Sequence, residues 1–214
     1  MQHLRIRFCR KQEVKFISHL DIIRLWQRAF HRAEIPLAYT EGFSPHPRIS
    51  LAAPLPIGVT SQAELMSILC TRQVSPHFFT AAVSRQLPYG IEILQVNQLA
   101  LAMPSLQAQV RYAEYVVEAE TQMKADDIQS AIADLLLLEN LPWQHQRNTG
   151  TRNYDLRYLI DHIWLIDWQS GQCTIGMRLR CDNSGSGRPE QVTIALGFSG
   201  HPRSINRSKL ILKT

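Results

Sequence analysis

A chain of 214 residues can bury one large hydrophobic core or two smaller ones. Its composition, with 45% hydrophobic residues, 10 Gly and 11 Pro, excludes a disordered or fibrous protein. No apolar run approaches the roughly 18 residues of a membrane span, and the N-terminus lacks the apolar stretch of a secretory signal. We therefore expect a cytoplasmic protein with no membrane contact, in which the four scattered cysteines are buried and unpaired: Cys9, Cys70, Cys173 and Cys181.

Positive charge is concentrated near the N-terminus. The formal net charge is +5. Residues 1–60 contain nine Lys or Arg and four Asp or Glu, an excess of five, whereas residues 61–214 contain fourteen of each sign. This asymmetry favours a polyanion partner such as RNA, held through its phosphates. A solvated basic face that only aids solubility is the alternative.

The first predicted element is a strand. Leu4, Ile6 and Phe8 alternate with Arg5 and Arg7. This period of two predicts a half-buried strand with both arginines on its outer face.

A helix is predicted to begin after Ser18. Ser18 is a preferred N-cap residue, and Asp21 lies near the positive end of the helix dipole. The expected apolar stripe contains Leu20, Ile22, Ile23, Trp26, Ala29, Phe30 and Ala33. Arg24, Arg28 and Arg32 share one ridge on the other side, where a phosphate, solvent or neighbouring acids would relieve their mutual repulsion.

The remainder of the first half completes a known order of elements. Proline and glycine are dense in residues 36–61, which predicts a rigid loop around short β segments at 37–39 and 48–52. A strand, a helix that begins at Ser75-Pro76, and a further strand follow, at residues 63–70, 76–87 and 91–96. The order is β-α-β-β-α-β, which is the ferredoxin-like pattern.

Residues 100–105 predict a junction, after which the order of elements repeats. Strands are expected at 109–120, 143–147, 158–168, 173–181 and 205–212, and helices at 125–138 and 189–196. Residues 154–166 are also compatible with a helix. We therefore expect an α/β (α+β) protein of two tandem ferredoxin-like domains with antiparallel sheets, at residues 1–100 and 106–214.

Several short motifs, taken in order and spacing, carry a family resemblance that covers most of the chain. The motifs are Arg5-Ile6-Arg7-Phe8, Lys15-Phe16-Ile17-Ser18-His19-Leu20-Asp21, Arg28-Ala29, Arg32-Ala33, Pro36, Ala38-Tyr39, Gly42-Phe43-Ser44-Pro45-His46-Pro47, Ser50, Pro54-Leu55-Pro56, Gly58, Ser61, Glu64, Asp155-Leu156-Arg157, Gly187-Arg188-Pro189-Glu190 and Arg207. Together they resemble the radical-SAM-linked domain of unknown function.

The resemblance implies a domain that is fused to, or encoded beside, a radical-SAM protein. That family often occurs near a ribonuclease of the E/G type and ribosomal-protein genes, which implies work on RNA or the ribosome. This chain lacks the CxxxCxxC cluster motif and a nucleotide-cradling Gly-rich loop. We therefore expect no cofactor in the chain itself, with any radical chemistry supplied by a radical-SAM partner.

The candidate RNA- or phosphate-binding residues are cationic or aromatic: Arg5, Arg7, Lys15, Arg24, Arg28, Tyr39, Phe43, Arg48, Arg157 and Arg188. We expect the cations of the first strand, the first helix and the proline-rich loop to converge in one anion-binding pocket. Trp26 is a further stacking candidate, although its position is more typical of a core residue. Arg157 and Arg188 are also typical of local ion pairs and caps.

Two histidines are the candidate catalytic residues. The helix dipole opposes protonation of His19, so we expect a neutral imidazole there, with Asp21 as its candidate carboxylate. His46 is held between Pro45 and Pro47. His19 and His46 suit a metal-independent RNA-processing enzyme, or, together with Asp21, a metal site, although we expect no metal.

Three functions follow from these residues together with what the family resemblance implies. The favoured one is an RNA-binding or substrate-positioning accessory protein that acts with a radical-SAM protein. The alternatives are a protein-interaction subunit of a radical-SAM enzyme without RNA contact, and an RNA-processing enzyme that uses His19 and His46. We expect no catalytic activity from the chain alone.

Overall fold

The computed structural model describes residues 1–147 and 150–213, so the expected end of the second domain at Thr214 lies outside the described residues. The described chain is α+β and divides into two compact units, Met1–Val110 with Lys213, and Arg111–Leu212. None of its described helices combines the length and hydropathy that crossing a membrane requires.

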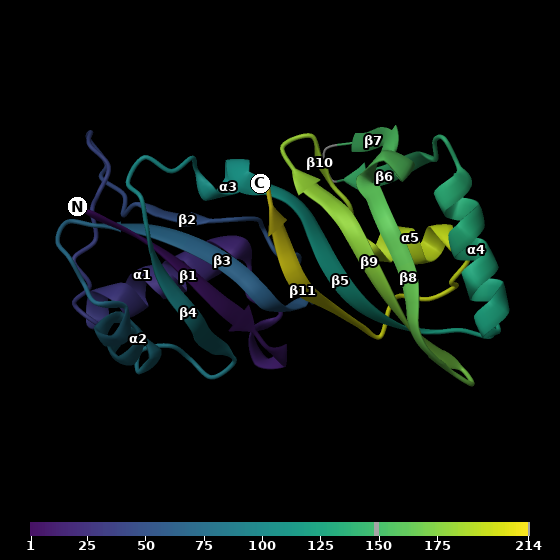
Figure 1. Cartoon of the computed structure of the whole chain (residues 1–214), viewed down its shortest axis with the longest axis horizontal. Helices are drawn as coiled ribbons and strands as arrows, with labels where there is room; N and C mark the ends of the chain where they lie inside the picture. Colours follow the sequence, from purple (N-terminus) through teal and green to yellow (C-terminus); the bar gives the residue numbers. More distant parts are fainter. Residues whose placement is uncertain (148–149, 214) are drawn as a thin grey trace. The chain divides into compact units, whose positions relative to one another are not determined.

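The first unit contains a sheet with strand order β4–β1–β3–β2, in which every neighbouring pair is antiparallel (Figure 1). The strands are β1 (Gln2–Arg10), β2 (Ile49–Leu51), β3 (Thr60–Cys70) and β4 (Ile91–Leu99). The helices are α1 (His19–Arg32), α2 (Pro76–Ser84) and the short α3 (Leu106–Gln109), and a 3₁₀ turn, η1 (Gln12–Val14), follows β1.

Helices α1 and α2 cover one face of this sheet. The apolar side chains of β1 enter the core on that face, where the rings of Phe8 and Trp26 meet edge to face with centroids 4.9 Å apart. Trp26 is fully buried, so it belongs to the core and offers no stacking surface. Leu20 was expected in the same stripe but is 64% exposed. It lies two residues before Ile22, which at 100° per residue places it on the opposite side of the helix.

Both predicted N-caps of the first unit are confirmed. The Ser18 hydroxyl accepts a hydrogen bond from the Asp21 N–H (3.2 Å), and the Ser75 hydroxyl accepts one from the Phe78 N–H (3.2 Å). Pro76 occupies the first helical position of α2, where its missing N–H costs no hydrogen bond.

The second unit has a sheet with strand order β11–β5–β9–β8 (Figure 1). Its strands are β5 (Val110–Glu120), β8 (Ile160–Gln169), β9 (Gln172–Asp182) and β11 (Ser204–Leu212), and the short β10 (Gly185–Ser186) also pairs with β9. The helices are α4 (Ala125–Leu137) and α5 (Pro189–Ala195), and the 3₁₀ turn η2 (Arg157–Leu159) precedes β8.

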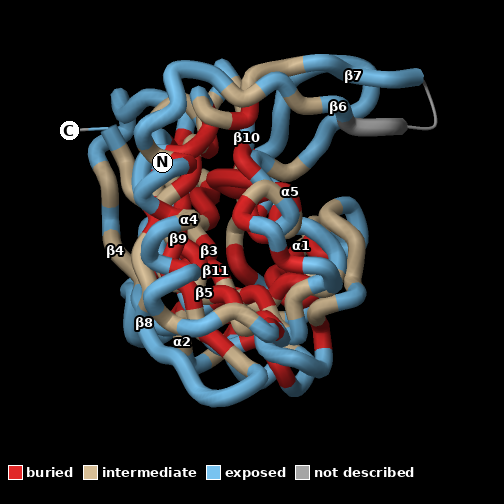
Figure 2. The backbone as a smooth tube through the Cα atoms, turned by 90° about the vertical axis from the view of Figure 1, so that its right-hand side faces the viewer, coloured by how far each residue is buried: buried red, intermediate tan, exposed pale blue. Residues whose placement is uncertain are grey.

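A separate hairpin, which the sequence did not predict in full, belongs to the second unit. Strand β6 (Pro142–Arg147) pairs with β7 (Gly150–Asp155). Figure 2 shows that β7 is mostly exposed. Residues 150–155 do not alternate between apolar and polar side chains, and a strand prediction depends on that alternation. Backbone pairing with β6 makes this segment a strand. The helix alternative for residues 154–166 is wrong, because η2 and β8 occupy most of that range.

The cysteines behave as expected. Cys9, Cys70, Cys173 and Cys181 are buried and free. Burial is the main cause that raises the pKa of the Cys9, Cys70 and Cys173 thiols, which keeps them protonated near neutral pH.

Candidate functional site

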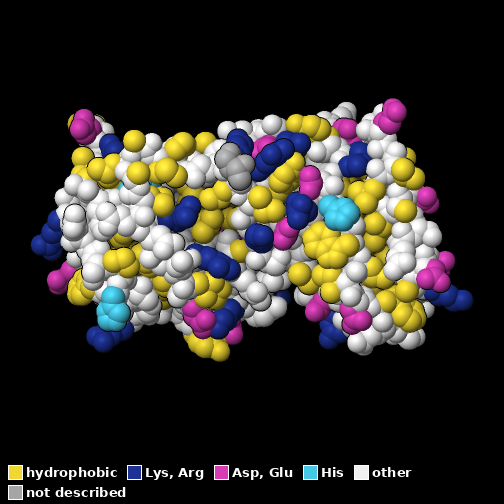
Figure 3. Space-filling model, in the orientation of Figure 1, with side chains coloured by type: hydrophobic (Ala, Val, Ile, Leu, Met, Phe, Trp, Pro, Cys, Tyr) yellow, Lys and Arg dark blue, Asp and Glu magenta, His cyan; other side chains and the backbone are white. Residues whose placement is uncertain are grey.

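The sheet face of the first unit that faces away from α1 and α2 carries basic and polar side chains together with leucines. Alternate residues of a strand point to opposite faces, so His3, Arg5 and Arg7 lie opposite the buried Leu4, Ile6 and Phe8. We call this surface the open face and define it by His3, Arg5, Arg7, Ser50, Ser67, Gln95 and Asn97. Lys or Arg side chains lie over the central part of these strands in the space-filling view (Figure 3).

The neighbours of the two arginines on the open face carry no charge. Arg5 stands between Ser67 of β3 and Asn97 of β4 in the strand register. Arg7 stands between Leu65 and Gln95. Within residues 1–147 and 150–213, neither arginine has an ion-pair partner. Their positive charge is therefore left for solvent or a ligand.

The carboxylate that follows Arg7 on the same face of this register is held by a lysine. Glu92 pairs with Cys9, beyond Arg7 along β1, and its side chain forms an ion pair with Lys11. This pairing raises the pKa of Lys11, chiefly through its hydrogen bond to Glu92. The acid thus offsets Lys11, and the open face stays positive.

Arg48 joins the open face at its β2 side. Its exposed side chain lines a pocket of about 330 Å³ together with His3, Ser50 and Ser67. Leu101 and residues 103–106 form another wall of this pocket. Since Ser67 lies opposite Arg5, the structure brings Arg5, Arg7 and Arg48 onto one surface.

The loop of residues 39–47, which we call the aromatic loop, leaves the sheet beside Arg48. Its base is closed by hydrogen bonds from the Thr40 N–H to the His46 carbonyl and from the His46 N–H to the Thr40 hydroxyl, both 2.9 Å. The Arg48 N–H donates a hydrogen bond to the Ala38 carbonyl. The Ala38 N–H in turn donates to the carbonyl of Leu69, near the end of β3. Phe43 is fully exposed and Tyr39 is 54% exposed. The loop thus presents both rings and His46 to solvent near the open face.

His19 lies at the other end of the sheet. Leu37, just before the aromatic loop, bridges Cys70, which pairs with Gln2 at the start of β1. His19 interacts instead with Arg10, the last residue of β1. Strand β1 has nine residues, so the eight steps from Gln2 to Arg10 separate the two ends of the strand by about 26 Å at ~3.3 Å per residue.

The structure therefore does not bring together His19 and His46, the two candidate catalytic residues. The same separation removes the metal alternative built from His19, Asp21 and His46. In the part of the chain that the structure describes, no three His, Cys, Asp or Glu side chains are grouped as a metal site would require.

His19 is half-buried and interacts with two buried charged residues, Arg10 and Glu64. Burial lowers the pKa of His19, the charge of Arg10 lowers it further, and Glu64 acts in the opposite direction. The expected neutral imidazole therefore agrees in direction, but burial and Arg10 are the causes in place of the helix dipole. Arg10 also donates hydrogen bonds to the carbonyls of Ile17 (2.8 Å) and Val14 (3.3 Å).

The carboxylate that acts on His19 was misassigned from the sequence. Asp21 accepts hydrogen bonds from the Ser18 hydroxyl (2.7 Å) and Arg24 (3.2 Å), and the first of these is the main cause that lowers its pKa. The acid that acts on His19 is Glu64, which is only 3% exposed. Its register opposite Phe8 places Glu64 on the core face of β3, and only the predicted strand pairing could have indicated this.

The predicted arginine ridge belongs to a different surface. Arg24 and Arg28 are exposed on α1, which covers the sheet face opposite the open face. Asp21 forms an ion pair with Arg24 at 3.2 Å, and the charge of Arg28 also lowers the Asp21 pKa. Lys15 lies at the Arg10 end, with its ammonium 5.1 Å from the Phe16 ring centroid. These cations are not brought together with Arg5, Arg7 and Arg48.

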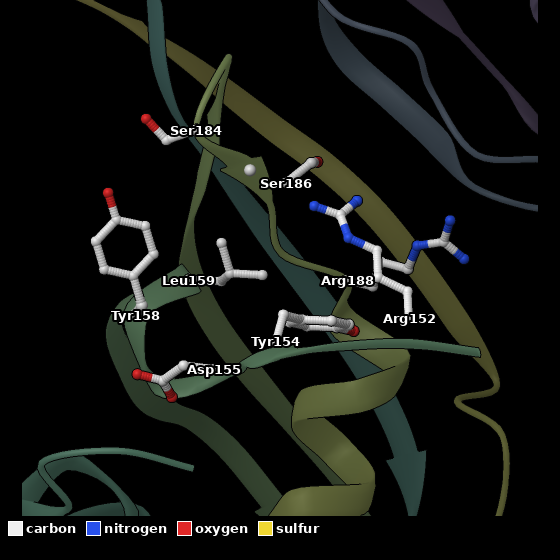
Figure 4. A pocket seen from close by; sticks show the side chains of 9 residues that line it. Arg152, Tyr154, Asp155, Tyr158, Leu159, Ser184, Ser186 and Arg188 are labelled. Atoms are coloured by element: carbon white, nitrogen blue, oxygen red, sulfur yellow. The ribbon is translucent and has the colours of Figure 1, made fainter. Parts of the chain in front are cut away.

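Arg157 and Arg188 lie in the second unit and differ in role. The Arg157 guanidinium donates to the carbonyls of Ile160 (2.7 Å) and Leu136 (3.0 Å), so it holds the fold together. Arg188 is exposed and lines a pocket of about 210 Å³ that also contains Arg152, Tyr154 and Tyr158 (Figure 4). The sequence missed Arg152 and Tyr154 because it did not predict β7, and it placed Tyr158 in a strand where the structure has η2.

Comparisons with known proteins place the chain in a family and support its fold. A family model described as "Uncharacterized protein conserved in bacteria (DUF2344)" matches residues 3–189. A crystal structure of a Cbf5–Nop10–Gar1 complex matches with a TM-score of 0.55 at 9% identity, over 97% of this chain and 48% of that chain. An archaeal box H/ACA sRNP Nop10–Cbf5 complex matches with a TM-score of 0.47 at 10% identity, over 96% of this chain and 46% of that chain.

The chain thus spans about half the length of these solved chains. At such low identity the likeness to the first of them concerns the fold alone. No curated protein matches the chain.

Proposed function

The chain belongs to the DUF2344 family of uncharacterized bacterial proteins, and from that premise we propose that it binds single-stranded RNA across the open face and the aromatic loop. One observation carries the proposal. Arg5, Arg7 and Arg48 share one surface, and their neighbours there are neutral polar or apolar side chains.

The chemistry of this surface suits a phosphate backbone. Arginine presents a planar fork of donors that matches phosphate oxygens, and binding to RNA releases condensed counterions. Arg5 and Arg7 lie two residues apart on one strand, so their backbone positions repeat at roughly 7 Å. An extended strand of RNA laid along β1 would therefore meet more than one cation.

Unpaired bases would find partners at the edge of the same surface. On the aromatic loop Phe43 is fully exposed and Tyr39 is 54% exposed, so both rings present surface to solvent. Stacking of a base on such a ring is worth roughly 1–3 kcal/mol. Gln95 and Asn97 add hydrogen-bonding groups on the sheet itself. These features favour single-stranded RNA over a duplex, whose bases are stacked internally.

We also propose that each unit holds one of two tandem ferredoxin-like domains, which the sequence places at residues 1–100 and 106–214. The strand orders β4–β1–β3–β2 and β11–β5–β9–β8 follow the same scheme: among the four strands of each order, the first in sequence lies between the last and the third. RNA-binding domains that use the open face of a four-stranded sheet offer an analogy. The analogy concerns the fold only, and the arginines carry the functional argument.

The family resemblance adds a radical-SAM protein as the partner to which the bound RNA would be presented. Exposed apolar side chains at the Arg10 end of the first unit favour a protein contact there. Phe16 is 71% exposed and Ile57 is 61% exposed, and the Gly58 N–H donates to the Lys15 carbonyl between them at 2.9 Å. This end lies away from the aromatic loop, so RNA and protein contacts would not compete for the same residues.

A catalytic pair of His19 and His46 does not form part of the proposal. The length of β1 lies between the two residues, which is too far for joint acid–base catalysis on one phosphodiester. We propose an accessory, substrate-positioning role without catalysis by the chain alone.

The test compares RNA types by fluorescence anisotropy with the full chain. We expect tighter binding of an unstructured oligoribonucleotide than of a duplex of equal length, and weaker binding by a Tyr39→Ala, Phe43→Ala variant. A matched variant, Tyr89→Ala, replaces another exposed ring of the same unit and should bind as the wild type does. Equal affinity for both RNA types, or an equal effect of Tyr89→Ala, would contradict the proposal. Co-purification with a radical-SAM protein that survives nuclease treatment, without RNA binding, would favour the protein-interaction alternative.

A further inference from the structure

The second unit contains a pocket whose wall combines cations, rings and hydroxyl groups. It has a volume of about 210 Å³ and is lined by residues of β7, η2 and the β9–β10 hairpin and by Arg188, the residue that precedes α5. The polar and aromatic lining consists of Arg152, Tyr154, Asp155, Tyr158, Ser184, Ser186 and Arg188. Figure 4 shows the Arg152 and Arg188 guanidinium groups on the same side of this space, with the Tyr158 ring across from them.

The two arginines of the pocket are free to meet an anion. Both are exposed, and neither forms an ion pair within the described residues. The Arg152 guanidinium carbon lies 5.8 Å from the Tyr154 ring centroid, a contact that leaves the guanidinium donors available.

The carboxylate in the pocket does not neutralise these arginines. One oxygen of Asp155 accepts hydrogen bonds from the N–H groups of Leu141 (2.8 Å) and Arg157 (2.9 Å). These backbone contacts fix the carboxylate at the start of η2. The remaining lining contributes two positive charges against this single negative one, so the pocket is positive.

The two rings are held in place from outside the pocket. The Tyr154 hydroxyl donates to the Gln191 side chain at 2.5 Å. The Arg180 guanidinium lies 4.3 Å from the Tyr158 ring centroid, and Arg180 forms an ion pair with Asp182 at 3.2 Å. Because both rings are already held in place, binding of a ligand would cost little side-chain entropy.

The β9–β10 hairpin forms the opposite wall, and its close packing requires glycine at positions 185 and 187. A Cβ atom added at Gly185 would lie 2.6 Å from the Leu159 side chain. One added at Gly187 would lie 2.9 Å from Leu179 and 3.1 Å from the Leu159 carbonyl. The hairpin therefore sits directly against Leu159, which places Ser184 and Ser186 on the rim of the pocket.

We propose that this pocket binds a single nucleotide, with the base against Tyr154 and Tyr158 and the phosphate at Arg152 and Arg188. Its volume is below the roughly 300–1,000 Å³ of sites for larger ligands, which fits one base better than two. The nucleotide can be free or be the terminal residue of an RNA chain. The site lies in the second unit, and the inference does not rest on RNA binding at the open face.

The first experiment measures binding of AMP and of inorganic phosphate to the full chain by titration calorimetry. We expect AMP to bind and inorganic phosphate to compete with it. Arg152→Ala combined with Arg188→Ala should weaken AMP binding at least tenfold, and the corresponding double Lys variant should recover part of the loss. Arg203→Ala, which removes an exposed arginine of the same unit, is the matched control and should leave the affinity unchanged.

A second comparison distinguishes the contribution of the Tyr154 ring to binding from that of the phosphate contacts. Tyr154→Leu should weaken binding of AMP but leave the affinity for inorganic phosphate within about twofold, and thermal unfolding checks that each variant is folded. Binding of a 5′-phosphorylated trinucleotide, compared with its 5′-hydroxyl form and with AMP, distinguishes an RNA terminus from a free nucleotide.

Absence of AMP binding to the wild-type chain, or AMP binding that survives the double Ala change, would overturn the inference. An Arg5→Ala, Arg7→Ala, Arg48→Ala variant should keep AMP binding. The experiments therefore test the nucleotide pocket and the RNA-binding open face independently of each other.

Discussion

The guanidinium of Arg157 donates a hydrogen bond of 3.0 Å to the backbone carbonyl of Leu136, twenty-one residues earlier in the chain. A second bond of 2.7 Å reaches the Ile160 carbonyl. The residue thus ties the end of α4 to the start of β8, and the structure gives it a structural role where the sequence suggested RNA.

We predict that Arg157→Ala lowers the free energy of unfolding by about 2 kcal/mol, since hydrogen bonds to charged groups are worth roughly 1.5–3 kcal/mol. RNA affinity measured well below the melting temperature should not change. Chemical denaturation and anisotropy on the same preparation check both parts. If the variant keeps wild-type stability but loses RNA affinity, the structural role is contradicted and Arg157 belongs to the RNA-binding site.

The half-buried position of His19 beside Arg10 predicts a pH-dependent stability. Burial and the Arg10 charge lower its pKa in the folded state below the roughly 6.5 of an unfolded chain. The unfolded chain therefore binds more protons between those two values, so this histidine's contribution to the free energy of unfolding is complete above pH 6.5 and is lost as the pH falls through the folded pKa.

We expect the wild type to lose more stability between pH 7 and pH 5 than a His19→Gln variant does. Urea denaturation at the two pH values measures the difference. His77→Gln, a change at an exposed histidine of α2, is the control and should follow the wild type. An identical pH dependence of the wild type and His19→Gln would contradict the assignment.

The Ser18 cap should contribute measurably to the first unit. Its hydroxyl accepts from the Asp21 N–H and also donates to the Asp21 carboxylate at 2.7 Å. Ser18→Ala removes both bonds, and we expect a loss of about 1 kcal/mol in the free energy of unfolding. Ser199→Ala, at an exposed serine outside any helix or strand, should leave the thermal midpoint unchanged. Equal midpoints for both variants would show that the cap carries no stability.

Gly176 offers a paired test of packing in the second unit. It lies opposite Trp164 in the register of β8 and β9, and an added Cβ would approach the indole to 2.0 Å. Gly176→Ala should therefore cost roughly 1–3 kcal/mol through overpacking. Gly200 has open space around the position of an added Cβ, so Gly200→Ala should be tolerated. Similar midpoints for the two variants would contradict the predicted clash.

Local patterns predicted much of the secondary structure. The alternation in β1, the Ser18 and Ser75 caps and the position of α4 are properties of neighbouring residues, and the structure confirms them. The hairpin strand β7 escaped prediction because it is ordered by pairing with β6 and carries no apolar pattern.

The site was harder to predict, because strand pairing decides which residues meet. Arg48 joins Arg5 through the pairing of β2 with β3, whereas Arg24 and Arg28 lie on the helical side of the same sheet. Nearness in sequence suggested one pocket for all these cations. The buried Glu64 and the Arg152–Arg188 pair depend equally on register and on a hairpin, which local patterns do not specify.

The salt dependence of RNA binding tests the account most directly. For single strands, the slope of log K against log salt changes by about 0.7 for each phosphate contact. We predict that Arg5→Ala, Arg7→Ala, Arg48→Ala flattens the slope by about 2, whereas Arg24→Ala, Arg28→Ala leaves it unchanged. A slope that the open-face variant leaves intact, or that the helix variant flattens instead, would contradict the assignment of RNA binding to the open face.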